Sequence, residues 1–390
     1  MRLNNYRCVF ASLVLASAAG ICLAQTAEAD KKDGDKKPDA AAAPATPPPA
    51  PVWSAGPITF SGLIDGYYSA NFNHPASRTN NLRNFEVKAN QFSLHMAKFT
   101  MEHEADPVGF KLDLGFGRAW EIFHATDPAT TDLVRYIPQA YVSLKPKTWG
   151  GFQIDFGKFY TSAGAELTEN NLTWSYGRGY LYTNGPYYHF GARITKPVNE
   201  VFAVGLQVVN GWNNVEDNNS GKTFGFTTAY TPKNKKFAWY NTYYVGPEKN
   251  DTNTGRRNFY DTVVNLTPSD KASFYFNFDY GKESKVTDTT DATWVAFGMA
   301  GRFAANEHWA FSPRYEVYDD RDGFITLQKQ RLHTFTLTGE YKWLEGLLAR
   351  LEFRHDRSNL PFYDRGNELA SAKTQNTLTL GIVAYFGPKR

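Results

Sequence analysis

Residues 151–157 read GFQIDFG, in which every second residue is apolar, and this alternation predicts a β-strand. The pattern stops after residue 157. Residues 161–187 follow as a segment rich in Asn, Gly, Tyr and Thr, and strand pattern resumes at Tyr188. Hairpin loops usually have about two to five residues, so this connection is far longer than a turn. In a closed barrel, a loop of this length can fold into the lumen and narrow it.

The rest of the chain repeats the same arrangement of short strands joined alternately by tight turns and long polar loops. Tight turns are expected at Asp106-Pro107 and at Ser269-Asp270, for example, and long loops follow the next strand in each case. The predicted strands are 58–72, 91–102, 110–120, 136–145, 151–157, 188–196, 201–210, 223–231, 237–245, 259–267, 272–280, 293–303, 309–318, 332–343, 347–356 and 377–386. This alternation is typical of membrane barrels. We therefore predict an all-β fold: a transmembrane, antiparallel, up-and-down β-barrel of about sixteen strands, with short periplasmic turns and long extracellular loops.

Individual strands show one apolar and one polar face. Phe274, Phe276 and Phe278 alternate with polar residues, and the strand that begins at Leu347 does the same. A soluble antiparallel sheet would give this pattern too, with its apolar face turned inward. Tyr and Trp residues near strand ends favour the membrane barrel, because aromatic girdles form at both interfaces. The girdle candidates are Tyr180, Tyr182, Tyr187, Tyr188, Trp239, Tyr243, Tyr244, Trp309 and Trp343.

Three regions are expected along the chain. Residues 1–24 combine basic residues with a short apolar run and predict a secretory signal peptide, with cleavage after Ala24 or as late as Ala29. Residues 25–56 are rich in Lys, Asp, Ala and Pro and predict a solvated periplasmic linker. Residues 57–390 form the barrel. Both cysteines, Cys8 and Cys22, lie in the signal region, so no disulfide is expected in the mature chain.

Strand parity places many charged side chains in the lumen, where they are predicted to line the pore. A charged residue facing lipid at mid-depth would cost about 2–4 kcal/mol, which supports this assignment. The alternative is that these charges pair with one another and only fill the lumen. The predicted pore-lining residues are Asp155, Arg193, Asp279, Arg302, Arg314, Glu316, Arg350, Glu352 and Arg354. The residues predicted to act from the long loop, as a pore constriction, are Glu166, Glu169 and Arg178.

From about residue 61 to residue 386 the chain resembles the putative β-barrel porin-2 family of Gram-negative outer-membrane proteins. The resemblance is carried by Gln139-Ala140-Tyr141-Val142, Asp155-Phe156-Gly157-Lys158-Phe159, Gly164-Ala165-Glu166, residues 350–356, Ser358-Asn359 and residues 377–386. His355 stands where an aromatic residue such as Tyr is more usual in the family. Phe386 precedes four further residues instead of ending the chain. The resemblance implies a pore in the bacterial outer membrane, and it implies no catalytic residue.

The motifs of common enzymes are absent from the sequence, including Gly-x-Ser-x-Gly, His-Glu-x-x-His and a phosphate-binding Gly loop. No enzymatic activity, cofactor or metal is therefore expected. Lys and Arg are dispersed among carboxylates, and the net charge of +3 gives no sign of nucleic-acid binding. We predict a porin for passive diffusion of small hydrophilic solutes or ions, in contact with outer-membrane lipid and with a homotrimer as a possible assembly. The alternatives are a solute-specific channel for sugars or organic acids, and a plugged barrel that serves as an adhesin or hydrolase.

Overall fold

The computed structural model describes residues 53–125, 127 and 134–388. The predicted signal peptide and nearly all of the predicted linker lie outside these residues. Sixteen long strands follow one another along the chain and form the wall of the molecule. They are β2 (Ile58–Asn71), β3 (Phe92–His103), β4 (Val108–Phe116), β5 (Gln139–Leu144), β6 (Gln153–Tyr160), β7 (Tyr188–Pro197), β8 (Phe202–Val209), β9 (Thr223–Tyr230), β10 (Phe237–Gly246), β11 (Arg257–Ser269), β12 (Ala272–Glu283), β13 (Ala292–Ala304), β14 (Trp309–Asp320), β15 (Gln330–Leu344), β16 (Leu347–Ser358) and β19 (Thr374–Phe386).

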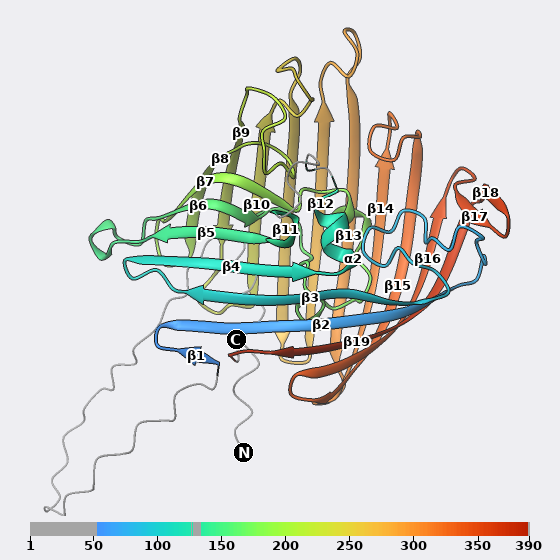
Figure 1. Cartoon of the computed structure of the whole chain (residues 1–390), viewed down its shortest axis with the longest axis horizontal. Helices are drawn as coiled ribbons and strands as arrows, with labels where there is room; N and C mark the ends of the chain where they lie inside the picture. Colours follow the sequence, from blue (N-terminus) through green and yellow to red (C-terminus); the bar gives the residue numbers. More distant parts are fainter. Residues whose placement is uncertain (1–52, 126, 128–133, 389–390) are drawn as a thin grey trace, which may run out of the picture.

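Each of these strands pairs antiparallel with its neighbours in sequence, and the last pairs with the first. The register of the closing pair runs from Thr377↔Asn71 to Phe386↔Gly62. In Figure 1 the front strands β2–β6 cross the rear strands β10–β14 steeply, as expected when tilted strands wrap round one axis. The predicted closed antiparallel barrel of sixteen strands is therefore confirmed.

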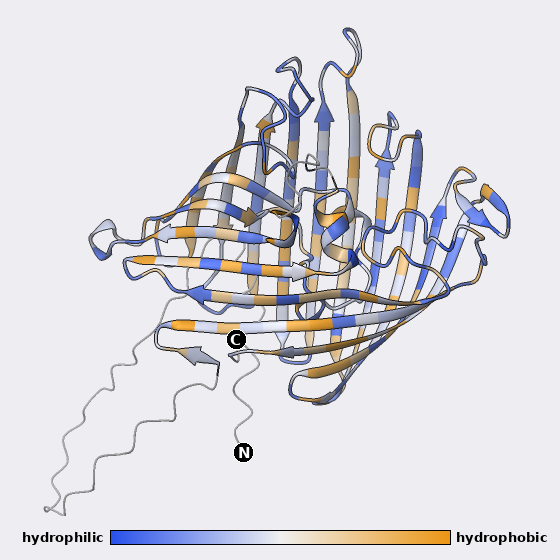
Figure 2. Cartoon of the chain, in the orientation of Figure 1, coloured by the Kyte–Doolittle hydropathy of each residue, from blue (hydrophilic) through white to orange (hydrophobic). Residues whose placement is uncertain are grey.

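Apolar side chains project outward from the wall in the expected two-residue period. Phe276, Leu351 and Ile382 are 37–53% exposed, and their neighbours in sequence point inward. Figure 2 shows this as hydrophobic and hydrophilic bands that alternate along the strands. Closure pairs every strand edge, so the backbone polar groups of the wall are bonded within the sheet, as a lipid environment requires.

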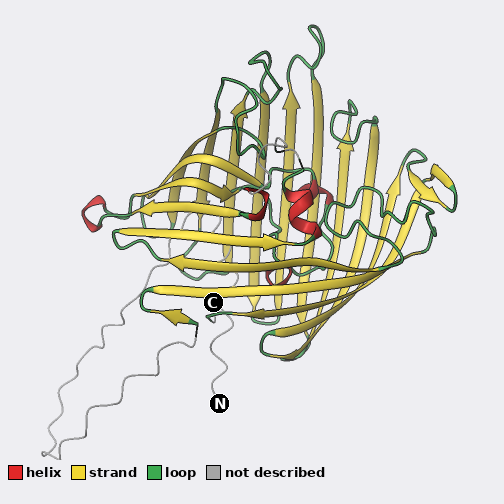
Figure 3. Cartoon of the chain, in the orientation of Figure 1, coloured by secondary structure: helices red, strands yellow, loops and turns green. Residues whose placement is uncertain are grey.

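Strands dominate the fold and the described helices are short (Figure 3). The helices are α2 (Arg118–Phe123), α3 (Tyr180–Thr183) and the 3₁₀ turns Val134–Tyr136, Lys147–Trp149 and Asn170–Leu172. None of the helices among the described residues is long and apolar enough to cross a membrane. Outside the barrel, β1 (Ser54–Ala55) pairs with the start of β2, and β17 (Tyr363–Arg365) pairs with β18 (Glu368–Ala372) in the last long loop.

One predicted strand is too long. Residues 110–120 were expected to be extended, but β4 ends at Phe116 and α2 begins at Arg118. Gly117 has a φ of +108°, and a Cβ there would lie 2.7 Å from the carbonyl oxygen of His95. The chain turns inward at this glycine, which brings Trp120 into the barrel interior. In the sequence pattern, an apolar residue at position 120 suits a helix that faces the lumen as well as it suits a strand.

Paired glycines lie in the wall just before and just after the long 161–187 connection. Gly157 on β6 lies opposite Gly191 on β7 and both have positive φ, +134° and +159°. A Cβ at either position would lie 2.2 Å from a carbonyl oxygen of the next strand, that of Ala140 or Val208 respectively. Only glycine allows this backbone approach. After Gly157, β6 stays paired with β7 as far as Tyr160↔Tyr188, and the side chains of Lys158 and Phe159 are both buried.

Candidate functional site: the lumen at loop 3

Loop 3, residues 161–187, connects β6 to β7 and reaches the opposite side of the barrel. Its hydrogen bonds extend to β14, which is eight places from β6 in the order of the sixteen wall strands. On the way it contacts β12, where the N–H of Ala165 donates to Asn277 Oδ1 at 3.0 Å. Loop 3 therefore crosses the lumen and does not fold back over its own strands.

Two charged residues of β14 hold the middle of loop 3. Arg314 forms an ion pair with Glu166 and donates to the carbonyl oxygen of Gly177 at 2.8 Å. Glu316 accepts the N–H of Tyr180 at 3.0 Å. Arg314 is 1% exposed and Glu316 is 3% exposed, so both charges are used by the loop and not by solvent.

Three charged residues of β16 complete this attachment. Glu352 accepts the N–H groups of Tyr176 and Gly177 at 2.7 and 3.0 Å. Arg350 donates to the carbonyl oxygen of Asn170 at 2.6 Å, and Arg354 donates to that of Arg178 at 2.7 Å. The charges match the backbone groups they meet, because the carboxylate faces N–H groups and the guanidinium groups face carbonyl oxygens.

Arg178 organises the inside of the loop. Its guanidinium donates to the carbonyl oxygens of Leu167 (2.7 Å) and Tyr176 (2.6 Å) and to Asn170 Oδ1 (2.6 Å). The side chain is fully buried. Arg178 thus connects the first half of loop 3 to the second half. It can do so because a guanidinium presents five N–H donors in one plane.

The remaining predicted site residues lie elsewhere in the lumen. Asp155 and Arg193 pair with each other on the adjacent strands β6 and β7, at 2.7 Å. Arg302 on β13 pairs with Glu340 on β15 at 2.8 Å. Asp279 lies on β12 and is buried.

Glu169 attaches loop 3 to another part of the wall, at β3. It forms an ion pair with Lys98 on β3 and accepts the hydroxyl of Tyr160 at 2.9 Å. Loop 3 therefore contains or bonds directly to eight of the predicted residues: Glu166, Glu169, Arg178, Arg314, Glu316, Arg350, Glu352 and Arg354. Asp279 meets the loop through Asn277, which bonds to both Asp279 and Ala165. Asp155, Arg193 and Arg302 form ion pairs within the wall.

Loop 1, residues 72–91 between β2 and β3, also enters the lumen, and sequence reasoning missed it. Arg83 pairs with Asp356 on β16 at 2.5 Å, and Glu86 lies 3.4 Å from Arg354. Burial raises the pKa of Glu86, but the nearby Arg83, Arg354 and Arg178 outweigh burial and lower this pKa below its usual value. One sequence signal could have indicated that loop 1 enters the lumen. Phe85 is an apolar residue between the charged Arg83 and Glu86 in an otherwise polar loop.

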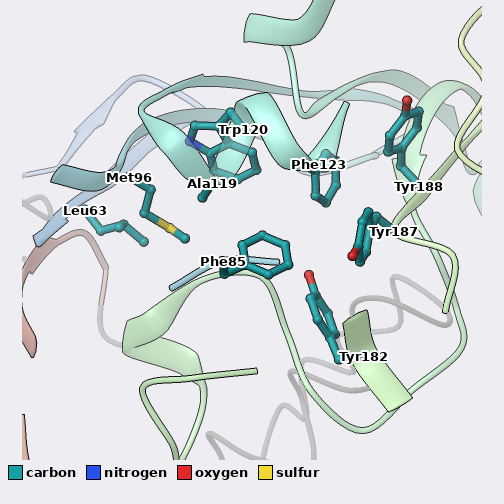
Figure 4. Close-up of a cluster of buried hydrophobic side chains, with 9 residues drawn as sticks. All are labelled: Leu63, Phe85, Met96, Ala119, Trp120, Phe123, Tyr182, Tyr187 and Tyr188. Carbon is teal, nitrogen blue, oxygen red and sulfur yellow. The ribbon is translucent and has the colours of Figure 1, made fainter. Parts of the chain in front are cut away.

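An aromatic cluster joins the inward segments (Figure 4). Phe85 of loop 1 faces Tyr182 and Tyr187 of loop 3, and Phe123 of α2 stacks on Tyr187 with ring centres 5.3 Å apart. Burial raises the pKa of Tyr182 well above its usual value. Tyr180, Tyr182, Tyr187, Tyr188 and Tyr244 are 0–8% exposed, so these five girdle candidates pack inside the barrel. Trp239, Trp309 and Trp343 are 45%, 44% and 67% exposed, as girdle positions require.

Among the described ranges, no group of three or more His, Cys, Asp or Glu residues is arranged to hold a metal ion. The lumen instead contains balanced pairs of charges that bond loops to wall. This arrangement can set the width and polarity of an aqueous path, and it has the closed, lipid-compatible wall of an outer-membrane porin.

The chain belongs to the family described as "Putative beta-barrel porin-2, OmpL-like", whose profile matches residues 57–386. It is therefore a bacterial outer-membrane β-barrel protein of a porin family. A sequence comparison with curated proteins gives no match.

Solved structures with a similar fold are also porins and channels. The anion-selective porin from Comamonas acidovorans matches with a TM-score of 0.56 and 11% identity, over 84% of this chain and 99% of that one. The outer-membrane channel DcaP of Acinetobacter baumannii gives 0.57 and 9%, over 84% and 97%. In-vitro folded OmpT of Vibrio cholerae, in its trimer form, gives 0.56 and 13%, over 84% and 99%. At these identities the similarity establishes the shared fold.

Proposed function

We propose that this protein is a porin for passive diffusion of small hydrophilic solutes and ions, with loop 3 as its constriction. The observation that carries the proposal is the path of loop 3 from β6 to β14 and β16, because a segment that crosses a barrel at mid-height narrows any aqueous path through it. The predicted roles of Glu166, Glu169 and Arg178 in the constriction follow from their positions in this loop.

Five of the nine predicted pore-lining residues are proposed to act mainly by fixing the loop, namely Arg314, Glu316, Arg350, Glu352 and Arg354. Arg314, Arg350 and Arg354 are 0–1% exposed. They therefore act on a passing ion indirectly, by holding loop 3 in place. Arg302 has a side chain that is 33% exposed, and it is the best candidate in this set for direct contact with a solute. Orientation of polar solutes by such paired charges is a known basis of channel selectivity.

The test is single-channel conductance of the refolded protein in a planar bilayer, with ion selectivity from the reversal potential in a salt gradient. Stable open steps are expected. Deleting residues 166–176 should raise the conductance of each step, because the segment that crosses the lumen is lost. The matched control is deletion of residues 285–290, which are exposed at the tip of the β12–β13 loop and should leave conductance unchanged.

A plugged barrel is the second candidate, and the burial of the lumen charges favours it. Three inward segments, namely loop 1, α2 and loop 3, pack together in the cluster of Figure 4. A bilayer that stays silent after verified insertion of the intact protein, but conducts after the 166–176 deletion, would establish this candidate and overturn the open porin.

We also infer a homotrimer in the membrane, an assembly supported by the trimer form of the structurally similar Vibrio cholerae protein. Mass determination of the detergent-solubilised protein by light scattering tests this inference. A monomer mass in several mild detergents would overturn it.

A further inference from the structure

Two buried carboxyl groups of the lumen have no cationic partner among the residues that the structure describes. Asp261 on β11 and Asp279 on β12 lie directly opposite each other in the strand register. They are 1% and 4% exposed. The other lumen carboxylates described above each meet a Lys, Arg or backbone N–H set, as Asp155 does with Arg193 at 2.7 Å. The ion pairs formed within the described part of the chain include neither Asp261 nor Asp279.

The two carboxyl groups instead share their partners. Asn277 donates through one nitrogen to Asp261 Oδ2 at 2.6 Å and to Asp279 Oδ1 at 3.0 Å. The two carboxyl groups belong to directly opposite residues of neighbouring strands. Two ionised carboxylates in one buried site without a cation repel each other, and one retained proton removes this repulsion. Like charges confined in one buried site retain such a proton, as in other carboxyl dyads.

This pair is connected directly to loop 3. Asn277, held by both carboxyl groups, accepts the N–H of Ala165 at 3.0 Å. The start of loop 3 is therefore bonded to the barrel wall through the carboxyl pair and the amide between them.

Other titratable groups near the pair are already engaged or neutral. Glu316 on β14 lies 3.7 Å from Arg314 and accepts the Tyr180 N–H. The charge of Arg314 is shared between Glu316 and Glu166. Tyr318 on β14 contributes a buried phenol, which is 1% exposed.

We propose that Asp261 and Asp279 form a proton-binding site that holds the first part of loop 3 against β12, so that loss of the shared proton releases this segment. With both groups ionised, their repulsion disturbs Asn277, which bonds to both of them, and weakens its bond to the N–H of Ala165. The proposal rests on the role of loop 3 given above and adds its regulation: rising pH loosens the loop.

The test measures exposure of loop 3 without relying on conductance. Residues 25–390 contain no cysteine, so Ala163→Cys introduces a single thiol next to the bonded segment. Its maleimide labelling rate is compared with that of Thr289→Cys, which lies in the exposed β12–β13 loop. The ratio of the two rates removes the pH dependence of the thiol itself. The range is about pH 4 to about pH 10, between the usual pKa values of carboxyl and phenol groups.

The ratio should rise about tenfold with pH, which corresponds to an attachment weakened by about 1.4 kcal/mol. Asp279→Asn in the Ala163→Cys chain should keep the ratio low throughout, because its neutral amide removes the repulsion at every pH. Asp261→Asn is the second variant, with the same expected result if the first fails to fold. Two outcomes would overturn the proposal. One is a ratio of labelling rates that does not change with pH when Asp261 and Asp279 are both intact, and the other is a rise that persists in both Asn variants. Absence of conductance in the planar bilayer would overturn the open porin and would not affect this proposal.

Discussion

The carboxylate of Glu352 on β16 accepts the backbone N–H of Tyr176 in loop 3 at 2.7 Å. Its second oxygen accepts the N–H of Gly177 at 3.0 Å, and the hydroxyl of Thr338 completes its bonds. A wall charge thus binds loop backbone and not another charge. Because backbone N–H groups are the same in every sequence, such an attachment depends on the path of the loop and not on its side chains.

Glu352→Ala should destabilise the protein and loosen loop 3. The substitution leaves two buried N–H groups without an acceptor, and each unsatisfied group costs about 1–3 kcal/mol. Urea unfolding in detergent measures the loss in the free energy of unfolding, and protease cleavage within residues 161–187 reports the loop. Glu352→Gln is the control, because it keeps one carbonyl acceptor and should show a smaller loss. Equal losses in the two variants would contradict this account.

Arg83→Met should show that loop 1 is attached through its charge. Arg83 and Asp356 are both buried, and removal of one partner of a buried pair typically costs about 3–5 kcal/mol. The lower end is expected, because Asp356 keeps Arg354 at 2.8 Å. In a double-mutant cycle, adding Asp356→Asn should cost less than the sum of the single changes. Additive losses would mean that the two side chains do not interact.

Glu86 should make the protein sensitive to acid. Burial acts to raise its pKa, but the charges of Arg83, Arg354 and Arg178 act more strongly and lower the pKa in the folded state. The stability that this gives is fully present above the unfolded pKa, about 4.3, and is lost as pH falls through the lower folded value. The free energy of unfolding should therefore decline below about pH 4. Glu86→Gln should flatten this decline, and an unchanged slope in that variant would assign the acid sensitivity to other groups.

The wall could be predicted from the sequence because strand structure is local and repeats every two residues. The predicted strand 347–356 contains Arg350, Glu352 and Arg354 on one face, and the structure places all three inside. Alternation specifies which face a residue occupies, since a slip by one residue would turn every side chain to the wrong side.

The partners of these residues could not be predicted, because they come from distant parts of the chain. Arg83 and Asp356 are separated by 273 positions, and nothing in the sequence near either residue indicates the other. Tyr182 and Tyr187 were expected among girdle residues because an aromatic residue near a strand end suits an interface and a folded-in loop equally well. Only the direction in which loop 3 runs separates these cases, and we expect that direction to depend on the close backbone approach at Gly157.

Gly157→Ala tests whether this close backbone approach directs loop 3 inward. The new Cβ would lie 2.2 Å from the carbonyl oxygen of Ala140, and φ of +134° disfavours any side chain. Strand β6 must then straighten or move away from β5, at a cost of about 1–3 kcal/mol for overpacking in addition to backbone strain. Gly164→Ala is the matched control, because its φ is +92° but a Cβ there has open space. It should cost only the strain, about 1–2 kcal/mol. Unfolding in urea should rank Gly157→Ala as the less stable variant, with more rapid protease cleavage of loop 3. If the two variants lose the same free energy, the backbone approach at Gly157 does not direct the loop.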